Sequence, residues 1–166
     1  IIVTMRRSVQ IKGLAILVLL VVTTCVWYAA LQQDHRGVLT VSFLDIGQGD
    51  SIFIQAPSGR QVLIDGGPDS SVLRALSDVS PWYDHSIDVV VATHPDADHT
   101  AGLIDVLPRY RVSIIVQSSV EGSTDMWKTF TAAAADEGAQ LVEAVRGEVF
   151  DLGGGARLEI LFPDRA

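Results

Sequence analysis

The chain has 166 residues, which is enough for one membrane anchor and one modest globular domain but not for two full domains. All of its acidic residues lie at or after Asp34, so residues 32–166 carry nine basic and 20 acidic side chains, a net charge of −11 that excludes a general affinity for polyanions. Cys25 is the only cysteine, which excludes an internal disulfide and a cysteine-rich zinc module.

The first predicted element is an apolar segment long enough to cross a membrane. Residues 13–31 carry no charged side chain, and a helix of that length, at about 1.5 Å per residue, nearly crosses a hydrocarbon core of about 30 Å. Basic residues precede the segment and Trp27 and Tyr28 lie near its far end, as expected for a cytoplasmic N-terminus and an interfacial aromatic pair. We therefore expect a cytoplasmic basic segment at 1–12, a transmembrane helix at 13–31 and a cell-membrane protein whose C-terminal domain lies outside the cytoplasm.

Two alternatives to an uncleaved anchor are less favoured. The apolar region of a cleaved signal peptide usually has only about 7 to 15 residues, and no A-x-A site follows this one. Lipidation of Cys25 is disfavoured because Thr24 stands where a small residue is expected and more apolar sequence follows. We interpret Met5, which two arginines follow, as a natural start, although the sequence could equally be an excerpt of a longer protein.

A short linker at 32–37 leads into a domain at 38–166 in which predicted strands and helices are interleaved. Apolar patterns of strand length predict strands at 38–46, 51–55, 61–64, 87–92, 112–116, 140–145, 148–152 and 157–162. Helical spacing of apolar residues predicts helices at 70–78, 100–107 and 125–137, with Thr100 as the expected N-cap of the second. This order predicts a layered α/β domain, but periodicity does not distinguish one such fold from another.

Four potential metal ligands follow the predicted buried strand at 87–92. The sequence HPDADH supplies two imidazoles and two carboxylates, from His94, Asp96, Asp98 and His99. If this loop is extended, residues 94, 96 and 98 share one side while His99 points elsewhere, so one segment could hold two metal ions. The alternative is a solvated loop turned by a proline, but the density of ligands favours metal binding.

The HPDADH motif resembles the HxHxDH signature of the metallo-β-lactamase superfamily, with Asp96 standing where the second histidine usually stands. FLDIGQGDSIFI at 43–54, LIDGGPD at 63–69 and THPDADHTAGL at 93–103 together resemble the hydrolase domain of ComEC-type competence proteins, in which such an aspartate is usual. The resemblance covers about residues 38–117 well. It implies a metallo-β-lactamase-like αββα sandwich, of which this chain would hold the N-terminal half to two-thirds, preceded by one transmembrane helix.

The resemblance also implies roles for individual residues. His94 and Asp96 would help to hold one metal ion, Asp98 and His99 the other, and Asp98 would also orient or deprotonate the attacking water. Asp65 corresponds to an aspartate at a strand end that supports the metal loop from behind, as metal sites commonly require; a simple turn-forming residue is the alternative. The residues of the LDIGQGD segment that we predict to face the site are Asp45, Gln48 and Asp50.

Together the ligand types and the resemblance predict two divalent metal ions, zinc or manganese. A carboxylate at position 96 shifts the preference toward Mn²⁺ without excluding Zn²⁺. Two ions about 3.5 to 4 Å apart would activate water and stabilise the attacking and leaving oxygens of a displacement, which suits phosphodiester cleavage. The resemblance implies that the substrate is DNA, degraded during competence-type uptake. Arg109 and Arg111 are interpreted as a solvated helix end rather than as contacts to a substrate anion.

The superfamily requires further metal ligands downstream of the loop. No histidine follows His99, so we expect the rest of the site to lie beyond Ala166 or to come from carboxylates such as Asp164. The chain resembles a stand-alone, single-anchor version of the ComEC-type proteins. Two other functions stay open: another hydrolase of the superfamily acting on a lactam, a thioester or a small phosphodiester, and an inactive accessory subunit of a DNA-uptake complex.

Overall fold

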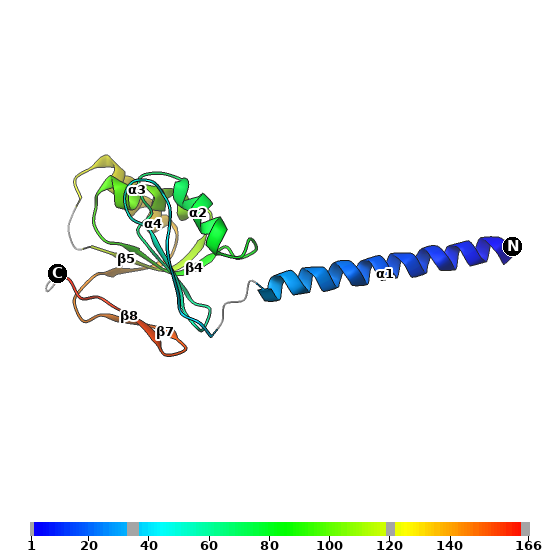
Figure 1. The fold of residues 1–166 in the computed structure, drawn as a ribbon. Helices are drawn as coiled ribbons and strands as arrows, with labels where there is room; N and C mark the ends of the chain where they lie inside the picture. The colour runs from blue at the N-terminus through cyan, green and yellow to red at the C-terminus, as the bar shows by residue number, and fades with distance from the viewer. Residues whose placement is uncertain (1, 33–36, 119–121, 164–166) are drawn as a thin grey trace. The chain divides into compact units, whose positions relative to one another are not determined.

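A computed structural model describes residues 2–32, 37–118 and 122–163, and the chain divides into two compact units, Ile1–Asp34 and His35–Ala166 (Figure 1). The first contains helix α1 (Ile2–Gln32). Within α1, Lys12–Ala29 has a mean hydropathy of 1.9 and no buried residue, so this helix is long and apolar enough to cross a membrane. It could therefore serve as a single anchor. Asp164 and most of the predicted linker at 32–37 lie outside the described residues.

The second unit is built on a sheet of six strands. In spatial order these are β1 (Thr40–Phe43), β2 (Ile52–Gln55), β3 (Gln61–Ile64), β4 (Ser86–Ala92), β5 (Arg111–Gln117) and β6 (Gln140–Glu143). Strands β1, β2 and β3 pair antiparallel, whereas β3, β4, β5 and β6 pair parallel. The loops that follow β3 and β4 therefore leave the sheet at the same edge, which is where the candidate site lies.

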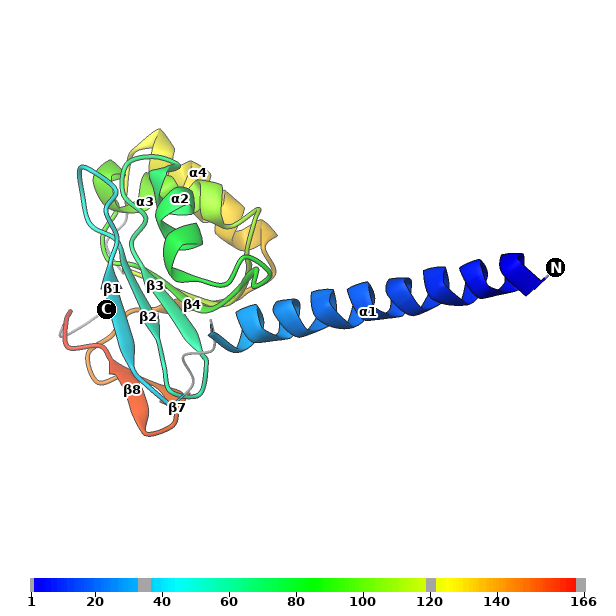
Figure 2. The ribbon, with the colours of Figure 1, turned by 45° about the vertical axis from the view of Figure 1, so that its right-hand side comes forward.

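Three helices cover one face of this sheet, and a two-stranded sheet lies on the other (Figures 1 and 2). The helices are α2 (Ser71–Val79), α3 (Ala97–Val106) and α4 (Asp125–Asp136), and the small sheet pairs β7 (Val149–Gly153) with β8 (Ala156–Glu159). The main core fills the helical side and includes Leu63, Leu103 and Phe130, each fully buried. The described residues thus form a helix layer, a large sheet and a smaller sheet.

Strand β4 shows why the apolar run after residue 86 predicts a strand covered on both faces. Val90 and Ala92 belong to the core under the helices, whereas Val89 and Val91 pack into a second core with residues of the β7–β8 hairpin such as Leu152. Because both faces are buried, the strand has no solvent-facing side and alternation disappears from its sequence.

The start of α3 differs from the prediction. The helix begins at Ala97, three residues before the expected N-cap at Thr100, and its N-cap is Asp96, with φ −83° and ψ 146°. The Asp96 side chain makes no capping hydrogen bond, and the Thr100 hydroxyl donates to the Asp96 carbonyl at 2.9 Å from inside the first turn. The predicted N-cap at Thr100 was therefore wrong, and because residue 98 is already helical, the condition of an extended loop over residues 94–98 is not met.

Strand β1 is also shorter than predicted, at Thr40–Phe43 rather than 38–46. The chain leaves the sheet after Phe43, and Gly47 and Gly49 adopt positive φ angles of 84° and 81° in the loop that follows. Only glycine adopts this region readily, so the glycines mark a turn where the apolar alternation alone predicted a strand.

Candidate metal centre

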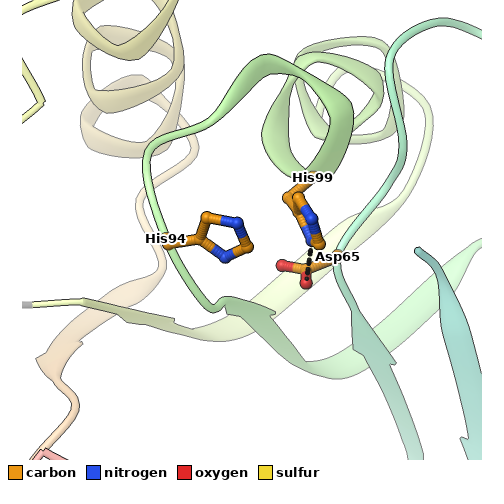
Figure 3. Close-up of side chains that lie close together, drawn as sticks. All are labelled: Asp65, His94 and His99. Carbon is orange, nitrogen blue, oxygen red and sulfur yellow. Dashed lines mark hydrogen bonds and ion pairs between the residues drawn. The ribbon is translucent and has the colours of Figure 1, made fainter. Parts of the chain in front are cut away.

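Two histidines and an aspartate meet at the carboxyl ends of β3 and β4 (Figure 3). Asp65 directly follows β3, His94 lies two residues after the end of β4, and His99 lies in the first turn of α3. One potential ligand atom from each residue lies within 4.8 Å of the others, and the ring centroids of the two histidines are 3.8 Å apart. Among the described residues this is the one group of three or more such side chains.

Asp65 is the buried centre of a hydrogen-bond network. Its side chain is only 4% exposed, and its Oδ1 accepts from the backbone N–H of Thr93 at 2.9 Å. Its Oδ2 accepts from the Thr93 hydroxyl at 2.6 Å and lies 2.9 Å from His99 Nδ1. Both oxygens are therefore engaged in holding the chain around the centre, which favours the predicted supporting role over that of a metal ligand.

The contact between Asp65 and His99 determines which ring nitrogen faces the centre. A carboxylate accepts a hydrogen bond, so it favours the tautomer of His99 that carries its proton on Nδ1. Nε2 then keeps its lone pair and is free to bind a metal ion. The backbone of Asp65 has a φ of 59°, a left-handed conformation that aspartate tolerates better than most residues.

Two glycine contacts hold α3 close to the strand end that carries Asp65. Gly66 donates its N–H to the His99 carbonyl at 2.6 Å, and Gly102 donates to the Gly67 carbonyl at 2.9 Å. A Cβ on Gly102 would lie 2.0 Å from the backbone oxygen of Gly66, and no side chain fits there. The glycines of the IDGG segment and of α3 are therefore needed for the helix to present His99 to the centre.

His94 and Asp96 lie on the solvent side of the centre. His94 Nδ1 is 2.8 Å from the Thr93 hydroxyl, and its Nε2 is 3.5 Å from Asp96 Oδ2. The two side chains are 40% and 71% exposed, so the Asp96 carboxylate is near His94 but is not fixed as that of Asp65 is. The assignment of this pair to one metal ion stays a prediction.

Asp98 and the LDIGQGD loop form the edge of the centre. Asp98 is partly buried in the first turn of α3 but is not in the group formed by Asp65 and the two histidines. A Cβ on Gly49 would lie 1.9 Å from the Asp98 carbonyl oxygen, so the loop packs directly against this turn. The three side chains predicted to face the site are all exposed: Asp45, Gln48 and Asp50.

An apolar pocket of about 510 Å³ opens beside His94. One wall is the sheet, through Ile64 and Val91, and the other follows the chain from β8 onward, through Ile160 and Phe162. The sequence analysis did not predict this pocket, because the residues named from its two walls are between 69 (Val91 to Ile160) and 98 (Ile64 to Phe162) positions apart in the chain. It gives the centre an apolar side as well as the charged side at Asp96.

The donor set fits divalent metal ions. His94 and His99 supply imidazole nitrogens, and the carboxylates of Asp96 and Asp98 lie on the same loop and first helical turn, so the set mixes the ligand types that zinc and manganese prefer. Sequence reasoning assigned no role to Thr93, whose N–H and hydroxyl both donate to Asp65. The sequence feature that could have indicated a role for Thr93 is its position between a predicted buried strand and the first predicted ligand.

Comparisons with known proteins indicate the family of the chain. The family model described as the beta-lactamase superfamily domain matches residues 60–162, more than half of the chain. The ComE operon protein 3 of Bacillus subtilis (strain 168) is 28% identical over 134 residues, which cover 68% of this chain and 17% of that protein. The chain therefore spans less than a fifth of the length of this relative.

Two metallo-β-lactamases are among the solved structures that resemble this chain. The Rm3 metallo-β-lactamase superposes with a TM-score of 0.51 at 17% identity, over 75% of this chain and 49% of that one. A HARLDQ motif mutant of the metallo-β-lactamase from Cronobacter sakazakii gives a TM-score of 0.48 at 16% identity, over 69% of this chain and 48% of that one. The predicted α/β fold is confirmed, and the chain belongs to the metallo-β-lactamase superfamily as a relative of the ComE operon protein.

Proposed function

We propose that this metallo-β-lactamase-fold hydrolase is a metal-dependent phosphodiesterase that cleaves DNA, anchored by α1 with its catalytic domain outside the cytoplasm. The observation that carries the proposal is the convergence of His94 and His99 beside the buried Asp65. The similarity to a ComE operon protein supports the resemblance to the ComEC-type competence proteins, from which the DNA substrate is inferred.

Each residue of the centre has a distinct role in the proposal. His94, His99, Asp96 and Asp98 hold two divalent ions, zinc or manganese, which when bound would activate water and stabilise negative charge on the substrate. Asp98 orients the attacking water and accepts its proton. Asp65 keeps the His99 ring in place through the 2.9 Å contact to Nδ1. Thr93 in turn fixes the Asp65 carboxylate.

The charge of the domain restricts how DNA can bind. With a net charge of −11 over residues 32–166, the domain repels a polyanion at long range, so attraction has to be local. Bound cations would supply that attraction, because they neutralise the carboxylates of Asp96 and Asp98. We therefore expect DNA affinity to depend strictly on the metal.

Cleavage of DNA by the purified full-length protein tests the proposal. We expect single-stranded or duplex DNA to be nicked in the presence of Mn²⁺ or Zn²⁺, and His94→Ala and His99→Ala each to abolish nicking. The matched control is His85→Ala, which removes an exposed histidine at the amino end of β4. Metal-loaded protein that leaves both forms of DNA intact would refute the nuclease assignment without affecting the fold.

A second candidate is favoured by the apolar pocket beside His94. Ile64, Val91 and Phe162 would accommodate an apolar substituent of a small phosphodiester or a thioester. A panel of chromogenic phosphodiesters, thioesters and lactams separates the two candidates. The small substrate would be favoured if the protein hydrolyses a small ester, if Phe162→Ala slows that hydrolysis, and if DNA stays intact.

A further inference from the structure

Two large aromatic side chains lie exposed side by side in the turn between α2 and β4. Trp82 is 76% and Tyr83 50% exposed, and their rings meet edge to face with centroids 5.6 Å apart. The turn that presents them is closed by a 2.9 Å hydrogen bond from the Asp84 N–H to the Pro81 carbonyl. Adjacent exposed aromatic residues on a soluble domain commonly mark a surface that meets a partner.

Basic side chains adjoin this turn. His85 contacts the ring of Tyr110 at 5.9 Å, and its carbonyl accepts the N–H of Arg111 at 2.9 Å, so the turn packs against the segment before β5. Arg109, Arg111 and His85 are all exposed. We call the following residues the aromatic–basic patch: Trp82, Tyr83, His85, Arg109 and Arg111.

The nearby carboxylates do not cancel this patch. Asp84 faces inward, where it accepts hydrogen bonds from Gln61 Nε2 and the Ser86 hydroxyl, both at 2.7 Å. Asp105 lies 3.9 Å from Arg109 and offsets part of its charge. Among the described residues Arg111 forms no ion pair with a carboxylate. The patch therefore combines two exposed rings with a modest positive charge.

Strand directions place the patch at the end of the sheet opposite to the metal centre. The patch adjoins the starts of β4 and β5, whereas the metal centre follows the end of β4. Strand β4 has seven residues at about 3.3 Å each, so its two ends are separated by roughly 23 Å. Strand β1 is antiparallel to β2, and β2 to β3, so β1 runs parallel to β4. The chain thus enters the sheet at the end that carries the patch.

The tether from α1 is short. Gly37 donates its N–H to the Pro57 carbonyl at 2.8 Å, which fixes it at the β2–β3 turn, on the same end of the sheet as the patch. Five peptide steps join Gln32, the last residue of α1, to Gly37, and a chain of that length reaches at most about 17 Å. The patch therefore lies at the end of the sheet at which the chain that follows α1 enters the domain.

We propose that the aromatic–basic patch docks on the lipid–water interface of the membrane that α1 spans. This rests on the anchoring part of the proposed function. Tryptophan and tyrosine prefer the interfacial region, and arginine is attracted to anionic headgroups. Docking there directs the metal centre away from the bilayer toward soluble substrate. Binding of DNA to the patch is less favoured, because the domain carries a net charge of −11 over residues 32–166 and Asp105 offsets part of the charge of Arg109.

Tryptophan emission of the full chain in lipid vesicles tests the docking. A Trp27→Phe background removes the tryptophan of α1 and leaves Trp82 together with Trp127, which is buried in the core at 6% exposure. The emission of Trp82 is obtained as the difference between this protein and a variant that also carries Trp82→Phe. We expect lipids brominated in the upper acyl chain to quench this signal by more than half. Quenching by aqueous iodide instead of brominated lipid would overturn the proposal.

Matched variants separate the contributions of lipid, charge and nucleic acid. Arg109→Gln with Arg111→Gln should weaken the quenching in vesicles that contain anionic lipid and leave it unchanged in zwitterionic vesicles. Phe43→Ala removes an 80% exposed ring at the far end of β1 and should change nothing. A Trp82 signal that responds to duplex DNA in detergent but not to brominated lipid would assign the patch to nucleic acid and overturn docking.

The outcome is distinct from that of the proposed hydrolase activity. Cleavage of soluble DNA in detergent should be the same in the patch variants and in the unsubstituted protein, since the patch is remote from His94 and His99. If the full chain fails to sediment with vesicles, both anchoring and docking are overturned. Loss of DNA cleavage with retained lipid quenching would refute the nuclease assignment and leave docking intact.

Discussion

Replacement of Asp65 by asparagine is the sharpest test of how the metal centre is organised. The substitution preserves the shape of the side chain and suits the backbone φ of 59°, because asparagine also tolerates the left-handed region. It changes the group that lies 2.9 Å from His99 Nδ1 from an obligate acceptor into one that can donate. We therefore expect the fold to persist while the histidine changes its tautomer.

The size of the effect follows from that tautomer. With an amide N–H directed at Nδ1, His99 is driven to carry its proton on Nε2, where it cannot bind a metal ion. Loss of such a supporting partner typically lowers metal affinity by about 10- to 100-fold, or roughly 1.4 to 2.7 kcal/mol. The Thr93 backbone N–H can still donate to the asparagine oxygen, and the Thr93 hydroxyl can turn to accept from the amide, which keeps the cost in folding stability smaller than the cost in metal binding.

Competition of the full-length protein with a chelator for Mn²⁺ or Zn²⁺ measures the affinity, and thermal unfolding of the metal-free form measures stability. Asp69→Asn is the matched control, because Asp69 lies on the same segment but is exposed and accepts from the Ser71 N–H at 2.8 Å. An affinity of Asp65→Asn within twofold of the unsubstituted protein would refute the tautomer argument. A loss far above 100-fold would instead make Asp65 a direct ligand.

Three further predictions concern stability. Phe130→Ala empties a fully buried site beside Trp127 and should cost about 3–5 kcal/mol in denaturant unfolding. Gly102→Ala places a Cβ 2.0 Å from the Gly66 oxygen and should lower unfolding free energy by at least about 1–3 kcal/mol; an unchanged melt would contradict the close approach. Burial raises the pKa of the Tyr110 phenol above its ordinary 10.0, so stability should fall as the pH rises past that value, and Tyr110→Phe should make this alkaline fall shallower in thermal melts.

The helices and strands were predictable because their apolar patterns are local. Strand β3 occupies Gln61–Ile64 as predicted, and α4 differs from its predicted range only in its last residue. The order of the strands was not predictable from periodicity, since an apolar run does not show which neighbour it pairs with. The fold came from the resemblance carried by the motifs, and the match of the beta-lactamase superfamily model over residues 60–162 supports it.

The centre was predictable in position but not in geometry. The density of ligands in HPDADH indicated where it lies, and the structure brings His94 and His99 together there. The bond between Asp65 and His99 joins residues 34 positions apart, and only the packing of α3 on the Gly66 backbone creates it. The helical start at Ala97 was missed because aspartate is equally common in loops and at N-caps.

The early start of α3 gives the centre an electric field of its own. The aligned peptide groups of a helix concentrate roughly half an elementary positive charge at its first turn, which here contains Asp98 and His99. This field opposes a cation and attracts an anion. The carboxylates of Asp96 and Asp98, on the loop and in the first turn, counteract it for a cation. Removal of either carboxylate, by Asp96→Asn or Asp98→Asn, should therefore weaken cation binding more than it weakens folding.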